Sequence, residues 1–355
     1  MASSLPLSQN AVAKAAGVSP STVSRALANH PGIPPKTRER IRQMAERMGY
    51  RKNAMVSMLT AQLRSSRLRK TESTLAYITS MPHSQMRGVN PTYYEFFLGA
   101  KARAEELGYG LDLLWRRETA MTAARFTKIL IARGVRGLLL APRPNAMSHI
   151  SLDWSKFAVA AIGHSLPAPH VSFSSAWHYN LIQTALRMLK KYGYRKIGFC
   201  ISPVSDKYAS FAFSSRYSLY LRSLPASDRV PFPQDPLVQE LPDRSKFERW
   251  FVRHRPEAIL CVGPRMPDWL VKMGCSIPQD VAIADLCLPD ESGTTAGMFE
   301  MPRVVAASAV DLVVEQLHHN VFGPPQYPKA VLFEGKWVDG KTLPKIIPSA
   351  RLSRK

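Results

Sequence analysis

The stretch that most constrains this chain is VAKAAGVSPSTVSRALA, residues 12–28, which predicts two short helices joined by a tight turn. Gly17 ends the first helix, because the residue that follows a helix often needs a positive φ. Ser19 is a favourable N-cap for the second helix. Pro20 suits its first position, since the amide that proline lacks would have no helical partner there. Small apolar side chains at helical spacing let the two helices cross closely. They are Val12, Ala13, Ala16, Val23, Ala26 and Leu27.

The second helix keeps a small, polar and basic face outside this core. The residues on that face are Pro20, Ser21, Thr22, Ser24 and Arg25. Such a helix, carried on another by a glycine-containing turn, is typical of the helix-turn-helix motif whose second helix enters the major groove of DNA. The alternative is an ordinary helical hairpin with a solvated face. The residues after this stretch favour the first interpretation.

A third helix is predicted from Pro34 to Met48, with an apolar side at helical spacing and a stop at Gly49. The whole stretch, VAKAAGVSPSTVSRALANHPGIPPKTRERIRQMAERMGYRKNA, resembles the N-terminal headpiece of the LacI/GalR family of bacterial transcription regulators. The resemblance is specific over residues 8–60. It is looser, but traceable through a regular pattern of strands and helices, to about residue 342.

The resemblance implies roles for the second helix. Pro20, Ser21 and Arg25 would reach base edges, and Arg25 suits the O6 and N7 atoms of guanine. Thr22 and Ser24 would bind phosphates, which fixes register without reading sequence. Ser19, at the start of the helix, completes the expected DNA-binding set.

Residues 53–63 follow the three helices and, by the resemblance, form a hinge that becomes helical when two subunits sit on the operator. Leu59 falls where the family has a leucine that wedges into the minor groove, and wedges of this kind bend the duplex. Asn53 and Val56 are the other expected DNA contacts, although Val56 stands where alanine is common. The alternative is a plain amphipathic linker helix that uses its leucines as core.

The charge distribution favours nucleic acid as a partner. The chain has 355 residues and a formal net charge of +22. Residues 1–70 contain 13 lysines and arginines against two glutamates, which is half of the net excess. Clustered positive charge of this kind is typical of phosphate binding with counterion release. No basic amphipathic helix with an aromatic face is present, so the sequence does not favour a membrane as partner.

Short apolar runs alternate with amphipathic helices from Leu75 onward, which predicts parallel sheets with helices on both faces. By the resemblance, this core has two similar lobes of the periplasmic-binding-protein type, and the chain crosses between them three times. The expected fold is therefore a small all-α helix-turn-helix headpiece joined to an α/β core of two doubly wound parallel-sheet lobes. The expected division is a headpiece at 1–52, a hinge and linker at 53–74, a core for effector binding and dimerisation at 75–345, and a basic tail at 346–355.

Ligands of open α/β lobes bind outside the carboxyl ends of the strands. Strand ends and helix starts give an expected ligand set of Thr92, Tyr93, Trp177, Asn180, Phe213, Gly263 and Arg265. Tyr93 and Trp177 suit stacking on a sugar or a heterocycle. The alternative is that both are helix-start residues packed on their lobe.

The core departs from the family pattern at ligand positions. Gly263-Pro264 stands where many members of the family have Asn-Asp. Phe213 falls where an arginine commonly binds the ligand. Cys287 replaces a usual aspartate, and residues 339–341 replace a frequent Arg-x-Ser. The family's usual saccharides are therefore not assured here. Two alternatives stay open. The core binds a different, more apolar ligand, or it is recognised by something other than a small-molecule ligand.

Other chemistry is not indicated. No phosphate-binding loop, dinucleotide fingerprint, nucleophile elbow or zinc spacing occurs, so we expect neither an enzyme nor a metal or cofactor. The four cysteines show no metal spacing and suggest reduced thiols. The N-terminus lacks signal-peptide features, which suggests a cytoplasmic protein. We therefore expect a homodimer that binds an operator in double-stranded DNA and an unidentified small-molecule effector. The alternative is an architectural DNA-bending protein with little sequence preference.

Overall fold

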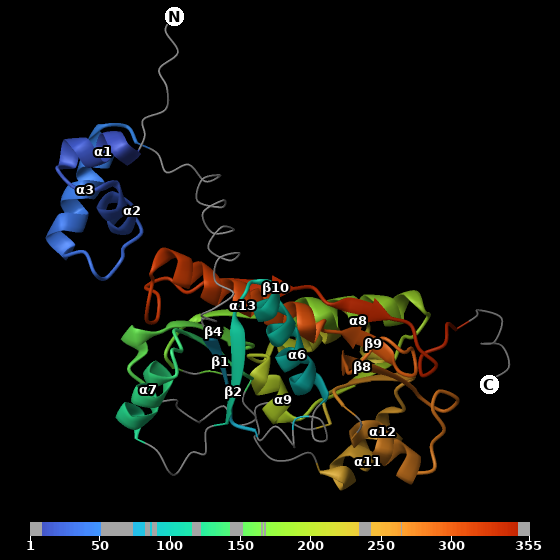
Figure 1. Ribbon diagram of the computed structural model, residues 1–355. Helices are drawn as coiled ribbons and strands as arrows, with labels where there is room; N and C mark the ends of the chain where they lie inside the picture. The colour runs from blue at the N-terminus through green and yellow to red at the C-terminus, as the bar shows by residue number, and fades with distance from the viewer. Residues whose placement is uncertain are drawn as a thin grey trace, which may run out of the picture.

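The structure is a computed structural model, and Figure 1 shows a small helical headpiece beside a larger core. It describes residues 9–50, 74–81, 86, 91–115, 122–142, 152–164, 166, 168–233, 243–263 and 265–346. The boundaries expected at residues 52, 53 and 74 fall in or beside the stretch 51–73, outside the described residues, and stay predictions.

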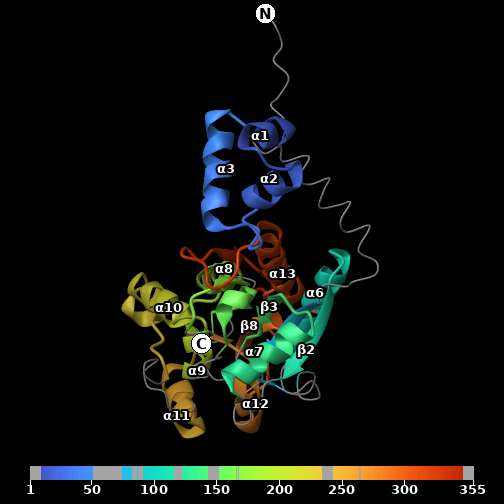
Figure 2. The ribbon, with the colours of Figure 1, turned by 60° about the vertical axis from the view of Figure 1, so that its left-hand side comes forward.

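Three helices form the headpiece: α1 (Gln9–Ala16), α2 (Pro20–Leu27) and α3 (Pro35–Arg47). Figure 2 shows α1 and α2 together on one side of α3. Their small core is made of Val12, Ala13, Ala16, Val23, Ala26, Ile33, Ile41 and Ala45, all buried. The predicted turn is confirmed, since Gly17 has φ of 64° and the Ser19 side chain accepts a hydrogen bond from the Thr22 amide at 3.2 Å.

The first lobe contains a six-stranded sheet in the order β10-β5-β4-β3-β1-β2, and every pairing in it is parallel. Its strands are β1 (Thr74–Thr79), β2 (Gly110–Trp115), β3 (Gly137–Leu140), β4 (Ala158–Ile162), β5 (Ser172–Ala176) and β10 (Ala330–Phe333). Its helices are α6 (Pro91–Glu106), α7 (Ala123–Ala132), the short η1 (Trp154–Lys156) and α13 (Pro302–His319).

Both faces of this sheet are covered, which explains why its strands read as continuous apolar runs. Alternate residues of a strand point to opposite faces. Leu75 and Tyr77 of β1 accordingly pack with α6 and α13, whereas Ala76 and Ile78 pack with α7 on the other side.

The second lobe contains a five-stranded sheet in the order β11-β9-β8-β7-β6. Its strands are β6 (Ile197–Cys200), β7 (Ala258–Cys261), β8 (Ala282–Leu288), β9 (Ala296–Phe299) and β11 (Lys336–Val338). Its helices are α8 (His178–Lys191), α9 (Pro203–Tyr208), α10 (Ala212–Arg222), η2 (Ala226–Asp228), α11 (Arg244–His254) and α12 (Arg265–Lys272). The edge strand β11 is antiparallel to β9, which differs from the purely parallel sheets that the sequence predicts.

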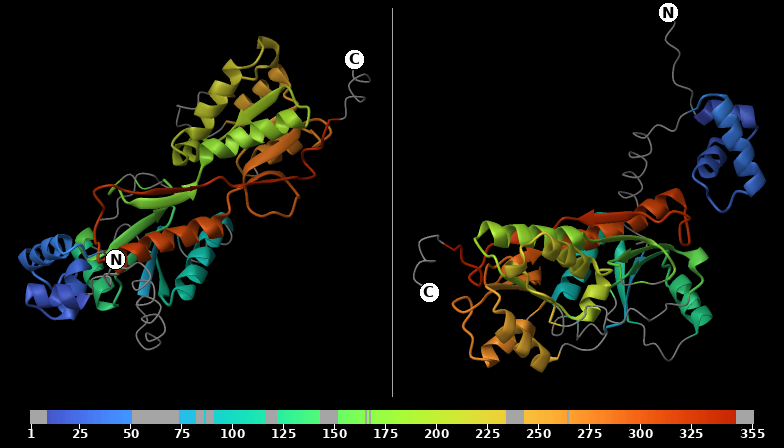
Figure 3. Two further views of the ribbon diagram at one scale, coloured as in Figure 1. Left: turned by 90° about the horizontal axis from the view of Figure 1, so that it is seen from above. Right: turned by 180° about the vertical axis from the view of Figure 1, so that it is seen from behind.

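The chain passes between the lobes three times, from β5 to α8, from β9 to α13, and from β10 to β11 (Figure 3). This confirms the number of crossings that the resemblance implies. Two of the crossings are hydrogen-bonded to each other, because the Phe333 carbonyl accepts from the Trp177 amide at 2.7 Å. The Asn180 side chain also donates to the Glu334 carbonyl at 3.5 Å. The remaining crossing, from β9 to α13, is joined to them where Glu300 Oε1 lies 3.5 Å from His178 Nε2, at the start of α8. We call these three connected crossing segments the lobe junction.

Two buried tyrosines of α10 offer a matched test of the second lobe. The Tyr217 hydroxyl lies 2.6 Å from the Val230 carbonyl oxygen and 2.8 Å from that of Ile197, whereas the buried Tyr220 hydroxyl has no hydrogen-bond partner among the described residues. We expect Tyr217→Phe to lower the free energy of unfolding by about 1–2 kcal/mol, because it leaves buried carbonyls without their donor. Tyr220→Phe should leave the free energy of unfolding unchanged or raise it slightly. Urea unfolding followed by circular dichroism measures both, and equal losses would contradict this assignment.

None of the helices in the described part of the chain is both long and apolar enough to span a bilayer.

Candidate DNA interface and lobe junction

Helix α2 presents most of its predicted DNA-reading residues to solvent. Ser19, Pro20, Ser21 and Arg25 are exposed, and the remaining two, Thr22 and Ser24, are half-buried. The inward side chains Val23 and Ala26 are buried against α1 and α3, so the outer face of α2 is fixed by the core of the headpiece.

The start of α2 is a compact group of hydroxyls. The Ser19 Oγ lies 2.8 Å from the hydroxyl oxygens of both Ser21 and Thr22. Ser19 also caps the helix, and Pro20 occupies its first turn. Free amide groups and the helix dipole make such an N-terminus favourable for phosphate.

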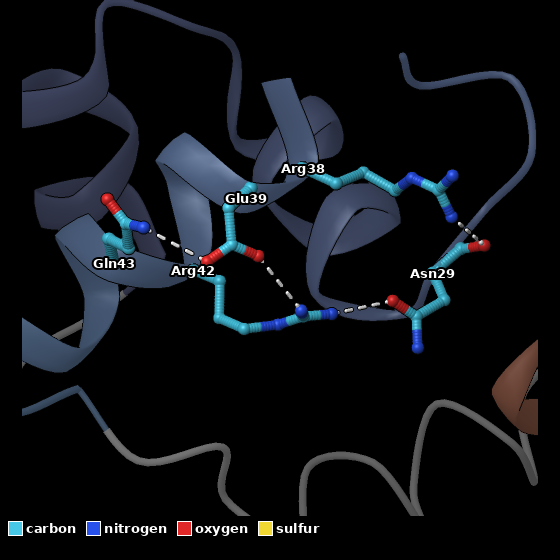
Figure 4. A network of polar contacts seen from close by, with 5 residues as sticks. All are labelled: Asn29, Arg38, Glu39, Arg42 and Gln43. Carbon is cyan, nitrogen blue, oxygen red and sulfur yellow. Dashed lines mark hydrogen bonds and ion pairs between the residues drawn. The ribbon is translucent and has the colours of Figure 1, made fainter. Parts of the chain in front are cut away.

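Some of the headpiece's positive charge has a structural role, as the network in Figure 4 shows. Arg38 donates to the Asn29 carbonyl at 3.2 Å, and Arg42 donates to the Asn29 side chain at 2.8 Å and to Glu39 at 3.2 Å. Gln43 donates to the same glutamate at 3.0 Å. These two arginines therefore hold the loop after α2.

Other basic residues remain available for phosphate. Lys14, Arg25, Lys36 and Arg47 are exposed and form no ion pair among the described residues. Arg40, by contrast, donates to the Ala16 carbonyl at 3.3 Å and so serves the end of α1.

The headpiece contacts the core through the far end of α2. The Asn320 side chain, at the end of α13, donates to the Ala28 carbonyl at 2.9 Å. This contact leaves Ser19, Pro20 and Ser21 exposed. The expected minor-groove residues Asn53, Val56 and Leu59 lie outside the described residues.

Three residues of the predicted ligand set lie beside the lobe junction, in the surroundings of His178, Cys287 and Glu300. Thr92, at the start of α6, is buried, and its hydroxyl interacts with the Cys287 thiol. Tyr93 is half-buried, and burial, followed by the nearby Tyr208, Cys287 and Glu300, raises the pKa of its hydroxyl to about 12.

Phe213 is also buried there, and its ring packs edge-on against the His178 ring, with centroids 5.2 Å apart.

The other four predicted ligand residues have different surroundings. Trp177 and Asn180 hold the crossings together, and the Trp177 side chain is 41% exposed. The Gly263 amide donates to the Asp285 carboxylate at 3.0 Å, and Arg265 is exposed at the start of α12.

Several polar groups at the junction are absent from the predicted ligand set. His178 Nε2 lies 3.5 Å from Glu300 Oε1, and the Cys287 thiol donates to Glu300 Oε2 at 3.3 Å. Asp206 is fully buried in α9. Burial raises the pKa of Asp285 to about 6, even though two backbone amides donate to its carboxylate. The sequence held one signal for Glu300, which is its position between the end of β9 and the start of α13.

His164 predicts a specific pH dependence. Burial, and secondarily the nearby His178, lower the pKa of His164 to about 4, from an unfolded value near 6.5. The unfolded chain thus binds a proton at higher pH than the folded protein does, and His164 costs stability as the pH falls below 6.5. Relative to wild type, His164→Gln should gain up to about 2 kcal/mol in free energy of unfolding between pH 7.5 and pH 5.

The variant must be compared with wild type at each pH, because Asp285 changes the free energy of unfolding with pH in the opposite direction. Its raised pKa makes the folded state take up a proton first, which adds stability as the pH falls from about 6 towards 4. Urea unfolding of both proteins at several pH values isolates the His164 contribution. A difference between the two that does not change with pH would contradict the assignment.

Comparison with known proteins agrees with this architecture. Residues 10–53 match the family model of the bacterial regulatory proteins of the lacI family. A structure of a complex of the transcriptional regulator CelR with cellobiose is 18% identical, with a TM-score of 0.56, over 95% of this chain and 99% of that chain. The lac repressor dimer bound to operator and the anti-inducer ONPF is 16% identical, with a TM-score of 0.53, over 96% of this chain and 100% of that chain.

A regulator of the Lacl family from Rhizobium etli, itself described as putative, is 16% identical over 77% of this chain and 99% of that chain, with a TM-score of 0.56. No curated protein sequence matches the chain. These similarities confirm the predicted class of fold, a small helical headpiece on a two-lobed, periplasmic-binding-protein-like core. The match over residues 10–53 confirms the resemblance of the headpiece to the lacI family.

Proposed function

We propose that this protein is a sequence-specific DNA-binding transcription regulator that acts as a homodimer in the cytoplasm. The observation that supports it most is the exposed, hydroxyl-rich start of α2, held by a buried three-helix core that matches the lacI family. Two headpieces would occupy adjacent half-sites, because the symmetry of an operator mirrors that of a dimer. Pro20, Ser21 and Arg25 would read bases, while Ser19, Thr22 and Ser24 would bind phosphates.

The hinge would add a second contact. We expect Leu59 to wedge into the minor groove between the two subunits, with Asn53 and Val56 beside it. Unstacking a base step costs a few kcal/mol, which the extra contacts of a bent duplex offset.

The core would control DNA affinity through a small-molecule effector at the lobe junction. The expected contacts are Thr92, Tyr93, Trp177, Asn180, Phe213, Gly263 and Arg265. A ligand shifts DNA affinity only as far as it binds the two arrangements of the lobes differently. A molecule that stabilises the core against heat should therefore also change operator affinity, and a saturating ligand that leaves operator binding unchanged would contradict this control.

Selection of binding sites from random DNA tests the proposal against its alternative. A sequence-specific dimer should enrich a palindromic consensus with two half-sites. An architectural DNA-bending protein, the second candidate, would enrich flexible sequences without a consensus. The exposed reading face of α2 favours the first candidate.

A further inference from the structure

One carboxylate at the lobe junction lacks a full set of hydrogen bonds. Asp206 is completely buried, and its Oδ1 accepts a hydrogen bond from the Ser214 amide at 3.3 Å. Its Oδ2 is buried and has no hydrogen-bond partner among the described residues. A buried carboxylate oxygen without a donor is costly, and buried polar groups in native proteins are nearly always satisfied. Ser214 and Phe213 supply hydrogen bonds to this carboxylate, and Oδ2 is the atom that a further donor would satisfy.

A second carboxylate shares the same neighbour. Glu300 is 8% exposed, and its Oε1 lies 3.5 Å from His178 Nε2. Its Oε2 accepts from the neutral thiol of Cys287 at 3.3 Å. Asp206 also interacts electrostatically with His178. One imidazole thus lies near two carboxyl groups, so it can offset the charge of only one of them when both are ionised.

In the part of the chain that the structure describes, no cationic side chain offsets the charge of these carboxyl groups. Among the described residues, no lysine or arginine forms an ion pair with Asp206 or Glu300. The described residues also contain no group of three or more histidine, cysteine, aspartate or glutamate side chains that could hold a metal ion. An organic ligand fits the site better than a metal does.

Aromatic side chains lie near His178 and Glu300. Phe213 packs against His178, and Tyr93 lies in the electrostatic environment of Glu300 and Tyr208. The buried Tyr208 hydroxyl has no partner among the described residues. Aromatic rings beside a desolvated negative group are a favourable environment for an organic cation.

We propose that the lobe junction binds a small organic cation, a molecule with a protonated amine or amidine beside an apolar part. Its N–H groups donate to Asp206 and Glu300, and its apolar part packs on Phe213 and Tyr93. A neutral saccharide also donates hydrogen bonds, but it leaves the negative charge uncompensated. This inference rests on the proposed effector site and names the chemical class of its ligand.

Calorimetric titration of the full chain at pH 7.5 tests the inference with matched probes. The cations are benzylamine, benzamidine and agmatine, and the neutral molecules are benzyl alcohol, benzamide and cellobiose. At least one cation should bind at least tenfold more tightly than every neutral molecule. Absence of binding by all three cations, or equal or tighter binding of a neutral molecule, would overturn the inference.

Variants locate the binding. Asp206→Asn and Glu300→Gln, checked for folding by circular dichroism, should each weaken binding of the cation at least tenfold. The matched control Asp290→Asn removes an exposed carboxylate and should leave the affinity unchanged. Equal affinity of all three variants would overturn the inference. Binding of the same protein to its selected duplex separates the proposed DNA-binding function from the cationic class of the ligand. Operator binding without any cation binding would overturn only the cationic class.

Discussion

Replacement of Arg25 by alanine is expected to weaken binding to the selected operator by about 5- to 150-fold, or about 1–3 kcal/mol. Arg25 is exposed on α2 and forms no ion pair among the described residues, so its guanidinium is available for the bidentate contact with guanine that its place in the motif implies. The variant should also tolerate any base at one operator position. Fluorescence anisotropy on the parent duplex and its single-base variants measures both effects.

Lys36→Ala is the matched control for Arg25→Ala. Lys36 is an exposed cation without an ion pair among the described residues, and it is not one of the predicted base-reading residues. Its loss should weaken binding to all duplexes alike and make the affinity less sensitive to salt. If Arg25→Ala behaved in the same uniform way, base reading by Arg25 would be refuted.

Gly297→Ala should lower the free energy of unfolding by more than about 3 kcal/mol, because the new methyl group meets backbone. Gly297 lies in β9 between β8 and β11, and its φ is 153°. A Cβ atom there would overlap the Asp285 carbonyl oxygen in β8. The substitution must therefore push β8 and β9 apart or change their register. Urea unfolding followed by circular dichroism measures the loss.

Gly108→Ala separates steric overlap from backbone strain. Gly108 also has a positive φ, of 78°, but a Cβ atom there would meet nothing within 4 Å. Its substitution should cost only the left-handed conformation, about 1 kcal/mol. Similar losses for the two variants would show that overlap with β8 is not the cause.

The sequence predicts most of the architecture because its signals are local. The turn at Gly17, the cap at Ser19 and the inward face with Val23 depend on neighbouring residues, and all three are confirmed. Other elements depend on residues that are distant in the sequence. The strand β5 is the serine-rich SFSSA, and it is a strand because it lies between β4 and β10. Likewise, β11 has three residues and exists through its pairing with β9.

The residues of the lobe junction could be predicted only in part, because their surroundings also depend on residues that are distant in the sequence. Thr92, Tyr93 and Phe213 follow from the positions of helices and from the resemblance. Asp206 comes from α9 and Glu300 from the segment between β9 and α13, and tertiary packing brings both near His178. The position of Glu300 just before α13 is a local signal, but it does not indicate His178 as the neighbour. The roles of Arg38 and Arg42 in the headpiece were also not predictable, because their partner Asn29 is fixed by the tertiary loop after α2.

Hydrogen–deuterium exchange of the full chain, with and without its selected duplex, tests the central claim most directly. If α2 lies in the major groove, the duplex should slow exchange at the amides of residues 19–25, and a scrambled duplex at the same salt concentration should slow it much less. Protection by the selected duplex that is confined to the core, with exchange across residues 19–25 unchanged, would contradict the account.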